Sequence, residues 1–217
     1  MSPRCVFVTG ATGYIGRALI PALLARGHTV RALARKTSAK LVPAGADTVI
    51  GDALEPATFS GAIAPADTLV HLIGTPHPNP AKAASFQTVD LRSVDAALTA
   101  ARIAKVRHFI YVSVAQPAPV MHAYIEARQA GEARIRASGI PATILRPWYV
   151  LGPGHRWPYL LIPFYAILKL LPPTREIARR LALITLEQMV CALVASIERG
   201  AAGTSVLDVP DIRIMDI

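Results

Sequence analysis

Short runs of apolar residues alternate along the chain with longer segments in which apolar residues recur at every third or fourth position. The short runs are typical of buried strands, and the longer segments are typical of helices with one apolar face. The predicted strands are 4–8, 28–33, 48–51, 68–73, 109–113, 142–146 and 205–209, and the predicted helices between them include 14–26, 86–103 and 121–137. Because strands and helices alternate, we predict right-handed βαβ units and an α/β fold of the Rossmann-like, doubly wound kind with a parallel sheet.

One segment departs from this alternation. After the strand at 142–146 come a stretch rich in glycine and proline, an almost wholly apolar run at 159–171, and two further prolines. The apolar run is shorter than the ~18 residues that a membrane span needs, and Pro163 interrupts it. We expect one domain over 1–217 in which residues 152–200 form a small helical cover over a substrate pocket. Docking to a membrane surface beside the basic residues 175–180, or a dimer interface, are the alternatives.

A glycine-rich turn joins the first strand to the first helix. Gly10, Gly13 and Gly16 have the spacing that lets a chain turn tightly, approach a pyrophosphate with its backbone amides, and pack a helix closely on a sheet. The first amides of the helix, aided by its dipole, then face the anion. We therefore predict a dinucleotide site at this turn. Its expected members are Gly10, Thr12, Gly13, Tyr14, Ile15 and Gly16.

The residues after the second strand bear on which dinucleotide is bound. NAD sites place a carboxylate about 20 residues beyond the glycine turn, where it binds the ribose 2′-hydroxyl. This chain has no Asp or Glu before Asp47, and Arg35 stands at the corresponding place. A guanidinium there can pair with a 2′-phosphate, assisted by Lys36 or Arg31. We predict NADP as the cofactor, with NAD as the alternative, and expect Asp52 to accept from the adenine amino group.

Composition and charge limit the classes of partner that we expect. The 217 residues carry a net charge of +9, but the basic residues are spread along the chain without a recognition-helix, zinc or aromatic RNA-binding pattern. We therefore expect a small-molecule substrate and no nucleic-acid partner. Two distant cysteines and scattered histidines predict neither a disulfide framework nor a metal site. Because no signal-peptide pattern stands at the start, we expect a cytoplasmic protein, as a monomer or homodimer.

Four motifs in chain order resemble the short-chain dehydrogenase/reductase superfamily. They are Thr-Gly-Ala-Thr-Gly-Tyr-Ile-Gly at 9–16, Gly-Asp at 51–52, Tyr-Val-Ser at 111–113 and Ile-Leu-Arg-Pro at 144–147. More narrowly, the chain is similar to the atypical and extended branch of NAD-dependent epimerase/dehydratase or NmrA-like proteins. The resemblance covers about residues 4–155. It implies a sheet of about seven parallel strands with the glycine turn at the topological switch point.

The resemblance also implies a catalytic set, namely a Ser or Thr after the fifth strand and Tyr-x-x-x-Lys on the next helix. Ser113 and Tyr124 match the first two positions, and Arg128 stands where the family has Lys. Spacing of four residues puts Tyr124 and Arg128 on one helix face. In the family the Tyr exchanges a proton with the substrate oxygen, the Ser orients that oxygen, and the Lys binds the nicotinamide ribose. Arginine can supply the charge and the ribose hydrogen bonds but no proton relay. The alternative for Arg128 is a helical ion pair with Glu132.

Further residues follow from the same resemblance. Pro147 resembles the family proline that lies against the nicotinamide, and Gly74 would line the pyrophosphate side. Trp148 and Tyr149 would form a wall of the substrate pocket, although Trp148 could equally fill the core. His155 would meet an anionic substrate group.

Three functions remain open at this point. The first is an NADP(H)-dependent oxidoreductase that transfers a hydride between nicotinamide and a carbonyl or alcohol carbon of a small, apolar substrate. The second is an NmrA-like protein that binds NADP and senses its redox state without turnover. The third is an accessory protein of a membrane complex.

Overall fold

The computed structural model describes residues 2–75, 78–118, 121–153 and 180–215. Within these ranges seven strands form one parallel sheet in the order β3-β2-β1-β4-β5-β6-β9. The order reverses between β1 and β4, which is the switch point at which open α/β sheets bind ligands. The strands are β1 Cys5–Thr9, β2 Thr29–Ala34, β3 Asp47–Ile50, β4 Thr68–His71, β5 His108–Val112, β6 Ala142–Arg146 and β9 Thr204–Asp208.

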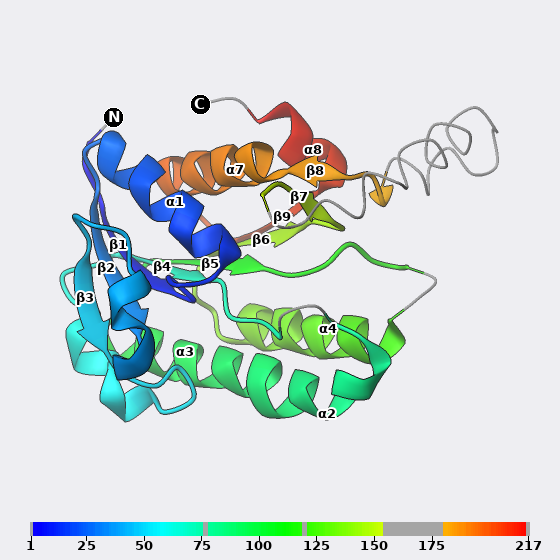
Figure 1. Ribbon diagram of the computed structural model, residues 1–217, viewed down its shortest axis with the longest axis horizontal. Helices are drawn as coiled ribbons and strands as arrows, with labels where there is room; N and C mark the ends of the chain where they lie inside the picture. Colours follow the sequence, from blue (N-terminus) through cyan, green and yellow to red (C-terminus); the bar gives the residue numbers. More distant parts are fainter. Residues whose placement is uncertain (1, 76–77, 119–120, 154–179, 216–217) are drawn as a thin grey trace.

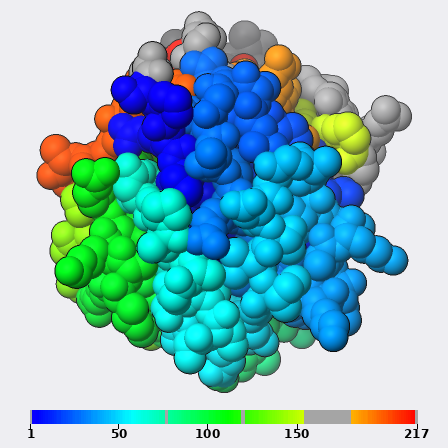
Figure 2. All heavy atoms as spheres, turned by 90° about the vertical axis from the view of Figure 1, so that its left-hand side faces the viewer, coloured from blue at the N-terminus to red at the C-terminus, as the bar shows by residue number. Residues whose placement is uncertain are grey.

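Helices cover both faces of this sheet (Figure 1). One face carries α1 (Tyr14–Ala25), α7 (Leu186–Arg199) and α8 (Val209–Ile214). The other carries α3 (Arg92–Ile103) and α4 (His122–Ala137), with the short α2 (Ala83–Ser85) and a π-helical turn, η5 (Phe86–Leu91), leading into α3. The 3₁₀ helices are η1 (Lys36–Leu41), η2 (Pro56–Thr58), η3 (Ser60–Ala62) and η4 (Pro80–Lys82). A space-filling view from the β3 side shows the segments between β2 and β4, blue to cyan, covering that end of the molecule (Figure 2).

Side chains of alternate strand residues enter two separate apolar layers. Val6, Val8 and Ile110 pack with residues of α1 and α7 on one face. Phe7 and Phe109 pack with residues of α3 and α4 on the other. Burial on both faces is the reason that the strands appear in the sequence as near-continuous apolar runs, without the polar alternation of a half-exposed sheet.

The predicted fold class is confirmed, and one element adds to the prediction. The helix α7 begins at a capping box, in which the side chains of Thr185 and Gln188 each accept from the other's backbone N–H. It packs on α1 and β5, in the layer of helices that covers this face of the sheet. A small second sheet, β7 (Val150–Leu151) with β8 (Ile184–Thr185), precedes it. The central part of the predicted cover, 154–179, lies outside the described residues. None of the described helices is long and apolar enough to cross a membrane.

Candidate functional site

A cavity of about 460 Å³ opens at the carboxyl ends of β1, β2 and β4. The glycine turn, the residues that follow β2 and β3, and residues 72–75 after β4 form its walls. This is the switch point of the sheet, where a Rossmann fold holds a dinucleotide. The predicted members that line it are Gly10, Thr12, Gly13, Arg35, Asp52 and Gly74.

The glycine turn leaves no room for side chains. Gly10 has φ +72°, and a Cβ there would lie 2.9 Å from the carbonyl carbon of Leu72. A Cβ at Gly16 would lie 2.5 Å from the carbonyl oxygen of Gly10, so only glycine lets α1 start this close to β1. Gly13 is the N-cap residue of α1 and offers no side-chain cap, and the first turn of α1 contains no acidic residue. The backbone amides of the first turn of α1 therefore suit a pyrophosphate.

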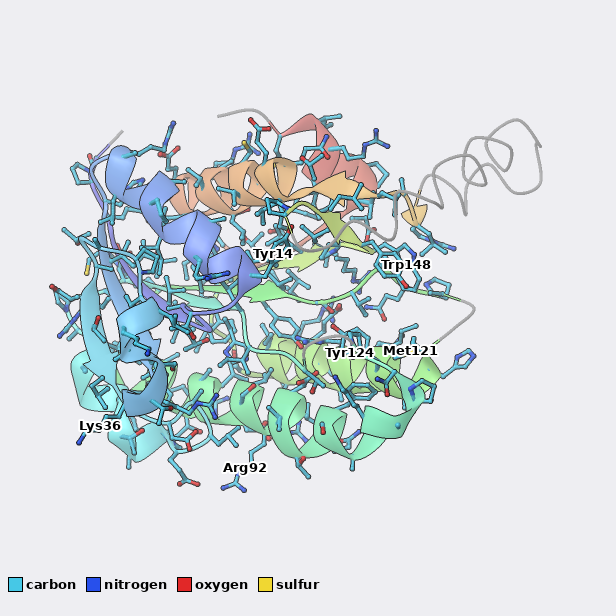
Figure 3. The ribbon with its side chains drawn as sticks, viewed as in Figure 1. Tyr14, Lys36, Arg92, Met121, Tyr124 and Trp148 are labelled. Carbon is cyan, nitrogen blue, oxygen red and sulfur yellow. The ribbon has the colours of Figure 1, made fainter. Side chains whose placement is uncertain are left out.

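Two other predicted members of the turn lie elsewhere. Ile15 packs against the apolar layer between the sheet and α1. The Tyr14 hydroxyl lies so close to Gly152 that a Cβ at position 152 would overlap it. Figure 3 shows Tyr14 at the start of α1, on the upper side of the sheet. Neither Tyr14 nor Ile15 is part of the cavity wall described here.

One of the three cations near β2 reaches the cavity. Arg35 follows β2, is exposed, and lines the wall beside Ser38. Ser38 donates from both its backbone N–H (2.9 Å) and its hydroxyl (3.2 Å) to the carbonyl oxygen of Arg35. Lys36 is exposed and lies at the periphery, outside the cavity lining (Figure 3). The Arg31 guanidinium donates to the carbonyl oxygen of Ala64, so the expectation that Arg31 assists Arg35 is wrong.

Asp52 closes the same end of the cavity. Its Oδ1 accepts from the backbone N–H of Leu54 at 2.9 Å, and its own N–H donates to the Thr58 hydroxyl at 3.0 Å. The second carboxylate oxygen of this exposed residue remains available to a ligand donor. Ser38 was missed from the sequence; its place three residues beyond Arg35 was the only signal.

Beneath residues 73–75 lies a buried charge network that we call the Arg128 centre, composed of Arg128, Asp90, Thr75, Tyr111 and Tyr124. The Nη1 atom of Arg128 donates to the Tyr111 hydroxyl (3.2 Å) and to the carbonyl oxygens of Ile73 (3.3 Å) and Val112 (3.1 Å). Its Nη2 atom donates to Asp90 Oδ2 at 3.3 Å. Arg128 thus lies at the carboxyl ends of β4 and β5 and binds a backbone carbonyl oxygen beyond each strand.

Asp90 joins this centre to the cavity wall. Its Oδ1 accepts from the N–H (2.7 Å) and the hydroxyl (2.9 Å) of Thr75, a lining residue. A Cβ at Gly74 would overlap Arg128 Nη2, so the guanidinium packs directly against the wall. Asp90 was missed from the sequence because its predicted helix gave no reason to turn a carboxylate inward.

Tyr124 packs on Arg128 as the four-residue spacing predicts. The guanidinium carbon lies 5.1 Å from the centroid of the Tyr124 ring and 5.7 Å from that of Tyr111. The edge of Phe86 meets Tyr124 from the other side, with ring centroids 5.1 Å apart. Tyr124 is therefore held between the π-helical turn and Arg128, on the α4 layer in Figure 3.

Ser113 belongs to a second network, the Glu132 cluster, which comprises Glu132, Ser113, Gln116, Arg136 and Arg146. The Ser113 hydroxyl donates to Glu132 Oε1 at 2.7 Å, as does the Gln116 amide. Arg146 binds both carboxylate oxygens, at 2.9 and 2.6 Å, and Arg136 donates to Oε2 at 3.2 Å. The alternative pairing of Arg128 with Glu132 is wrong, because Arg128 pairs with Asp90.

Burial and charge act together on the titratable groups of both networks. Burial raises the pKa of Asp90 against the opposing effects of Arg128 and Thr75. Burial disfavours a charged Arg128, but Tyr111, Tyr124 and Asp90 outweigh it and raise its pKa, so the guanidinium stays protonated. Burial also opposes the Glu132 carboxylate, but hydrogen bonds from Arg146 and Ser113 hold the pKa of Glu132 below its ordinary value.

The remaining predicted residues follow β6. Pro147 is buried, and its carbonyl oxygen accepts from the N–H of Ala115 at 2.8 Å. The rings of Trp148 and Tyr149 meet edge to face with centroids 5.2 Å apart, and Trp148 packs partly on the apolar layer of α1 and α7. Burial raises the pKa of Tyr149. His155 lies outside the described residues.

A family model described as NAD(P)H-binding matches residues 10–155, which include the glycine turn and both buried networks. The chain belongs to this NAD(P)H-binding family. The resemblance to the short-chain dehydrogenase/reductase fold is confirmed by a superfamily member from Agrobacterium tumefaciens with bound NAD. The two share a TM-score of 0.67 at 21% identity over 94% of this chain and 77% of that one.

Two relatives of this NAD(P)H-binding protein are named as reductases. A ceramide reductase from Caulobacter vibrioides is 29% identical over 210 residues, which cover 96% of this chain. A 4-hydroxy-2-methyl-3-oxo-4-farnesyl-3,4-dihydroquinoline-1-oxide ketoreductase from Stigmatella aurantiaca is 36% identical over 109 residues, 49% of this chain. The matches span 65% and 32% of the lengths of these two relatives.

Proposed function

We propose that the protein is an NADP(H)-dependent oxidoreductase of the short-chain dehydrogenase type. The observation that carries the cofactor preference is the position of Arg35 and Ser38 in the cavity wall immediately after β2. A guanidinium is a donor suited to a 2′-phosphate, whereas a 2′-hydroxyl site needs an acceptor at this position. The carboxylate on this wall, Asp52, comes from the end of β3 and suits the adenine amino group.

The residues of the Arg128 centre support hydride chemistry at the other end of the site. A bound nicotinamide supplies or accepts the hydride. The Tyr124 phenol would give a proton to the substrate oxygen during reduction and take it back during oxidation. Arg128 would lie beside the bound ribose, since its Nη2 packs against Gly74 of the cavity wall. Its guanidinium also orients the Tyr124 ring on which it packs.

In this proposal Ser113 does not have the role that the family resemblance implied, which is to orient the substrate oxygen. A hydroxyl has one proton, and that of Ser113 is donated to Glu132. It therefore cannot also donate to a substrate oxygen while the Glu132 cluster is intact. We assign Ser113 to positioning the end of β5 against α4.

The substrate proposed is a carbonyl or alcohol on a small apolar molecule. The aromatic pair Trp148 and Tyr149 follows Pro147 and supports a wall for such a molecule. The names of the two reductase relatives, which act on a ceramide and on a farnesylated ring, point the same way.

The second candidate is an NADP-binding redox sensor without turnover. The commitment of the Ser113 proton to Glu132 favours it, because a sensor needs no donor to a substrate oxygen. Turnover of NADPH with apolar carbonyl compounds, lost in Tyr124→Phe with NADPH affinity retained, would support the oxidoreductase. A wild-type protein that binds NADPH tightly but oxidises it with none of these compounds would favour the sensor.

The cofactor is tested first, by calorimetric titration with NADP and NAD at fixed ionic strength. We expect Arg35→Ala to weaken NADP binding at least about ten-fold and to leave NAD binding unchanged, since only NADP carries the 2′-phosphate. Lys36→Ala removes the neighbouring cation outside the cavity and is the matched control, with an expected change below about two-fold. Equal losses in the two variants, or tighter binding of NAD by the wild type, would refute the NADP assignment.

A further inference from the structure

We propose that Asp90 is a positioning residue that sets the relative affinity of the site for oxidised and reduced cofactor, by neutralising Arg128 beneath the nicotinamide half of the dinucleotide. The inference rests on the proposed function only in requiring that the site bind a nicotinamide dinucleotide; it requires no turnover.

Arg128 and Asp90 lie on the β4–β5 side of the switch point. A dinucleotide that crosses this point has its adenosine half toward β2 and β3, where Arg35 and Asp52 are, and its nicotinamide half toward the carboxyl ends of β4 and β5. Arg128 binds the carbonyl oxygens at those ends, Ile73 and Val112, and packs against Gly74. The charge of Arg128 would therefore lie beside the nicotinamide half of a bound dinucleotide.

Asp90 is placed to cancel this charge. Its side chain is 1% exposed in a π-helical turn, and Arg128 is 4% exposed. The carboxylate accepts from three donors, namely the N–H and hydroxyl of Thr75 and the Nη2 of Arg128. Burial raises the pKa of Asp90, but the guanidinium and the two Thr75 donors favour its carboxylate, and with Asp90 ionised the pair is neutral as a unit.

The other groups that face Arg128 carry no charge in this arrangement. Tyr111 of β5 accepts a hydrogen bond from Arg128, and burial raises its pKa, which keeps it neutral. Tyr124 of α4 contributes its ring face. The His71 ring of β4 is tilted against that of Tyr111 with centroids 5.9 Å apart, and burial together with Arg128 lowers the pKa of His71 to about 3. Among the described residues, Asp90 is therefore the counter-charge of Arg128.

This arrangement has a consequence for cofactor selection. The nicotinamide ring is positively charged when oxidised and neutral when reduced, while the pyrophosphate, adenosine and 2′-phosphate are the same in both forms. Contacts with these shared parts contribute equally to the two dissociation constants. The ratio of the constants therefore depends only on contacts that respond to the charge of the nicotinamide ring. A neutral Arg128–Asp90 pair tolerates the cationic ring, whereas an uncompensated guanidinium would repel it.

The test measures the dissociation constants of NADP⁺ and NADPH by calorimetry in four proteins: wild type, Asp90→Asn, Arg128→Met, and the double variant. Asp90→Asn should shift the ratio toward NADPH by on the order of ten-fold, and Arg128→Met should shift it toward NADP⁺ by a similar factor. The double variant removes both charges and should return to within about three-fold of wild type. A purely structural role cannot produce opposite shifts that cancel.

The matched control is Asp95→Asn, which makes the same charge change in α3 but in an exposed ion pair with Arg134; its ratio should equal that of wild type. If Asp90→Asn does not fold, Arg128→Met and the double variant carry the test. An unchanged ratio in whichever single variant folds, or a double variant displaced as far as a single one, overturns the proposal. If the wild type prefers NAD, the same ratios are measured with NAD⁺ and NADH, so a wrong cofactor assignment is distinguished from a wrong role for Asp90.

Discussion

Arg128 and Glu132 lie one helical turn apart on α4, and both are buried charges, but their surroundings differ. The two oxygens of Glu132 receive five donor contacts, from Ser113, Gln116, Arg136 and twice from Arg146. Two of the charged or amide donors, Gln116 and Arg146, come from other segments, and Arg136 comes from α4 itself. Arg128 also has several partners, yet its Nε is buried with none among the described residues. The Glu132 carboxylate is therefore fully paired by protein donors, whereas one N–H of the Arg128 guanidinium has no partner among the described residues.

This contrast between the partners of Arg128 and of Glu132 indicates which of the two networks serves a ligand. An unpartnered buried donor costs about 1–3 kcal/mol, so among the described residues Arg128 is the less fully compensated of the two charges. Its Nη2 packs against Gly74 of the cavity wall, so the Arg128 centre is the network that lies beside the proposed dinucleotide site. Glu132 instead ties β6 and the end of β5 to α4, and its place in the molecule is structural.

The largest effect is expected from breaking the saturated network. Glu132→Gln keeps the shape of the side chain but removes the charge that Arg146 and Arg136 compensate. Removing one partner of a buried ion pair costs about 3–5 kcal/mol, so the free energy of unfolding should fall by that amount in urea titrations. The matched control, Glu126→Gln, changes an exposed residue of the same helix and should alter stability by less than about 0.5 kcal/mol. Equal stabilities of the two variants would show that the cluster does not hold α4.

The strand positions could be predicted from the sequence because each strand is buried on both faces. The bounds of β6, 142–146, agree with the prediction at both ends. The strand β4 ends at His71, two residues earlier than predicted, because residues 72–75 leave the sheet to form the cavity wall. Apolarity persists across that point, so the pattern alone gave no sign of it.

The site could be predicted in part. The glycine turn and Arg35 depend on local spacing after a strand; the family resemblance singled out Tyr124 and Arg128, and their four-residue spacing put them on one helix face. Asp90 did not, because a π-helical turn at Phe86–Leu91 changes the phase of the helix, and a pattern with a period of 3.6 residues contains no such turn. Except for Arg136, four residues on in α4, the partners of Glu132 come from other parts of the chain, which no local pattern brings together.

A smaller, pH-dependent effect tests how far the charge of the Arg128 centre reaches. His71 hydrogen-bonds Thr9 (2.9 Å) and Ser93 (3.1 Å), and burial followed by Arg128 lowers its pKa from 6.5 to about 3. The folded protein therefore favours neutral imidazole. The stability that this provides is complete above pH 6.5 and is lost as the pH falls toward 3, because the unfolded chain binds the proton first.

We expect this group to contribute a slope of about 1.4 kcal/mol per pH unit to the unfolding free energy below pH 6.5, and His71→Gln should lack that slope. Urea titrations at several pH values between 6.5 and 5 measure it. His108, whose pKa burial lowers to about 4, acts in the same direction, so some slope remains in the variant. Identical slopes in wild type and His71→Gln would mean that His71 does not titrate between the two states.

The smallest effect on stability is expected at Ser113, one of several donors to Glu132. Ser113→Ala removes one of the five donor contacts to Glu132 and leaves Arg146, Arg136 and Gln116 in place. A single hydrogen bond to a charged group contributes about 1.5–3 kcal/mol at most, and the remaining donors reduce the loss to about 1 kcal/mol. Turnover should fall less than about ten-fold, because Ser113 has no proton to offer a substrate. Tyr124→Phe is the comparison and should lose at least about 100-fold. A Ser113→Ala protein that is as stable as wild type but as inactive as Tyr124→Phe would reverse this assignment. It would mean that substrate binding takes the serine hydroxyl from Glu132 and that the saturated network opens during the reaction.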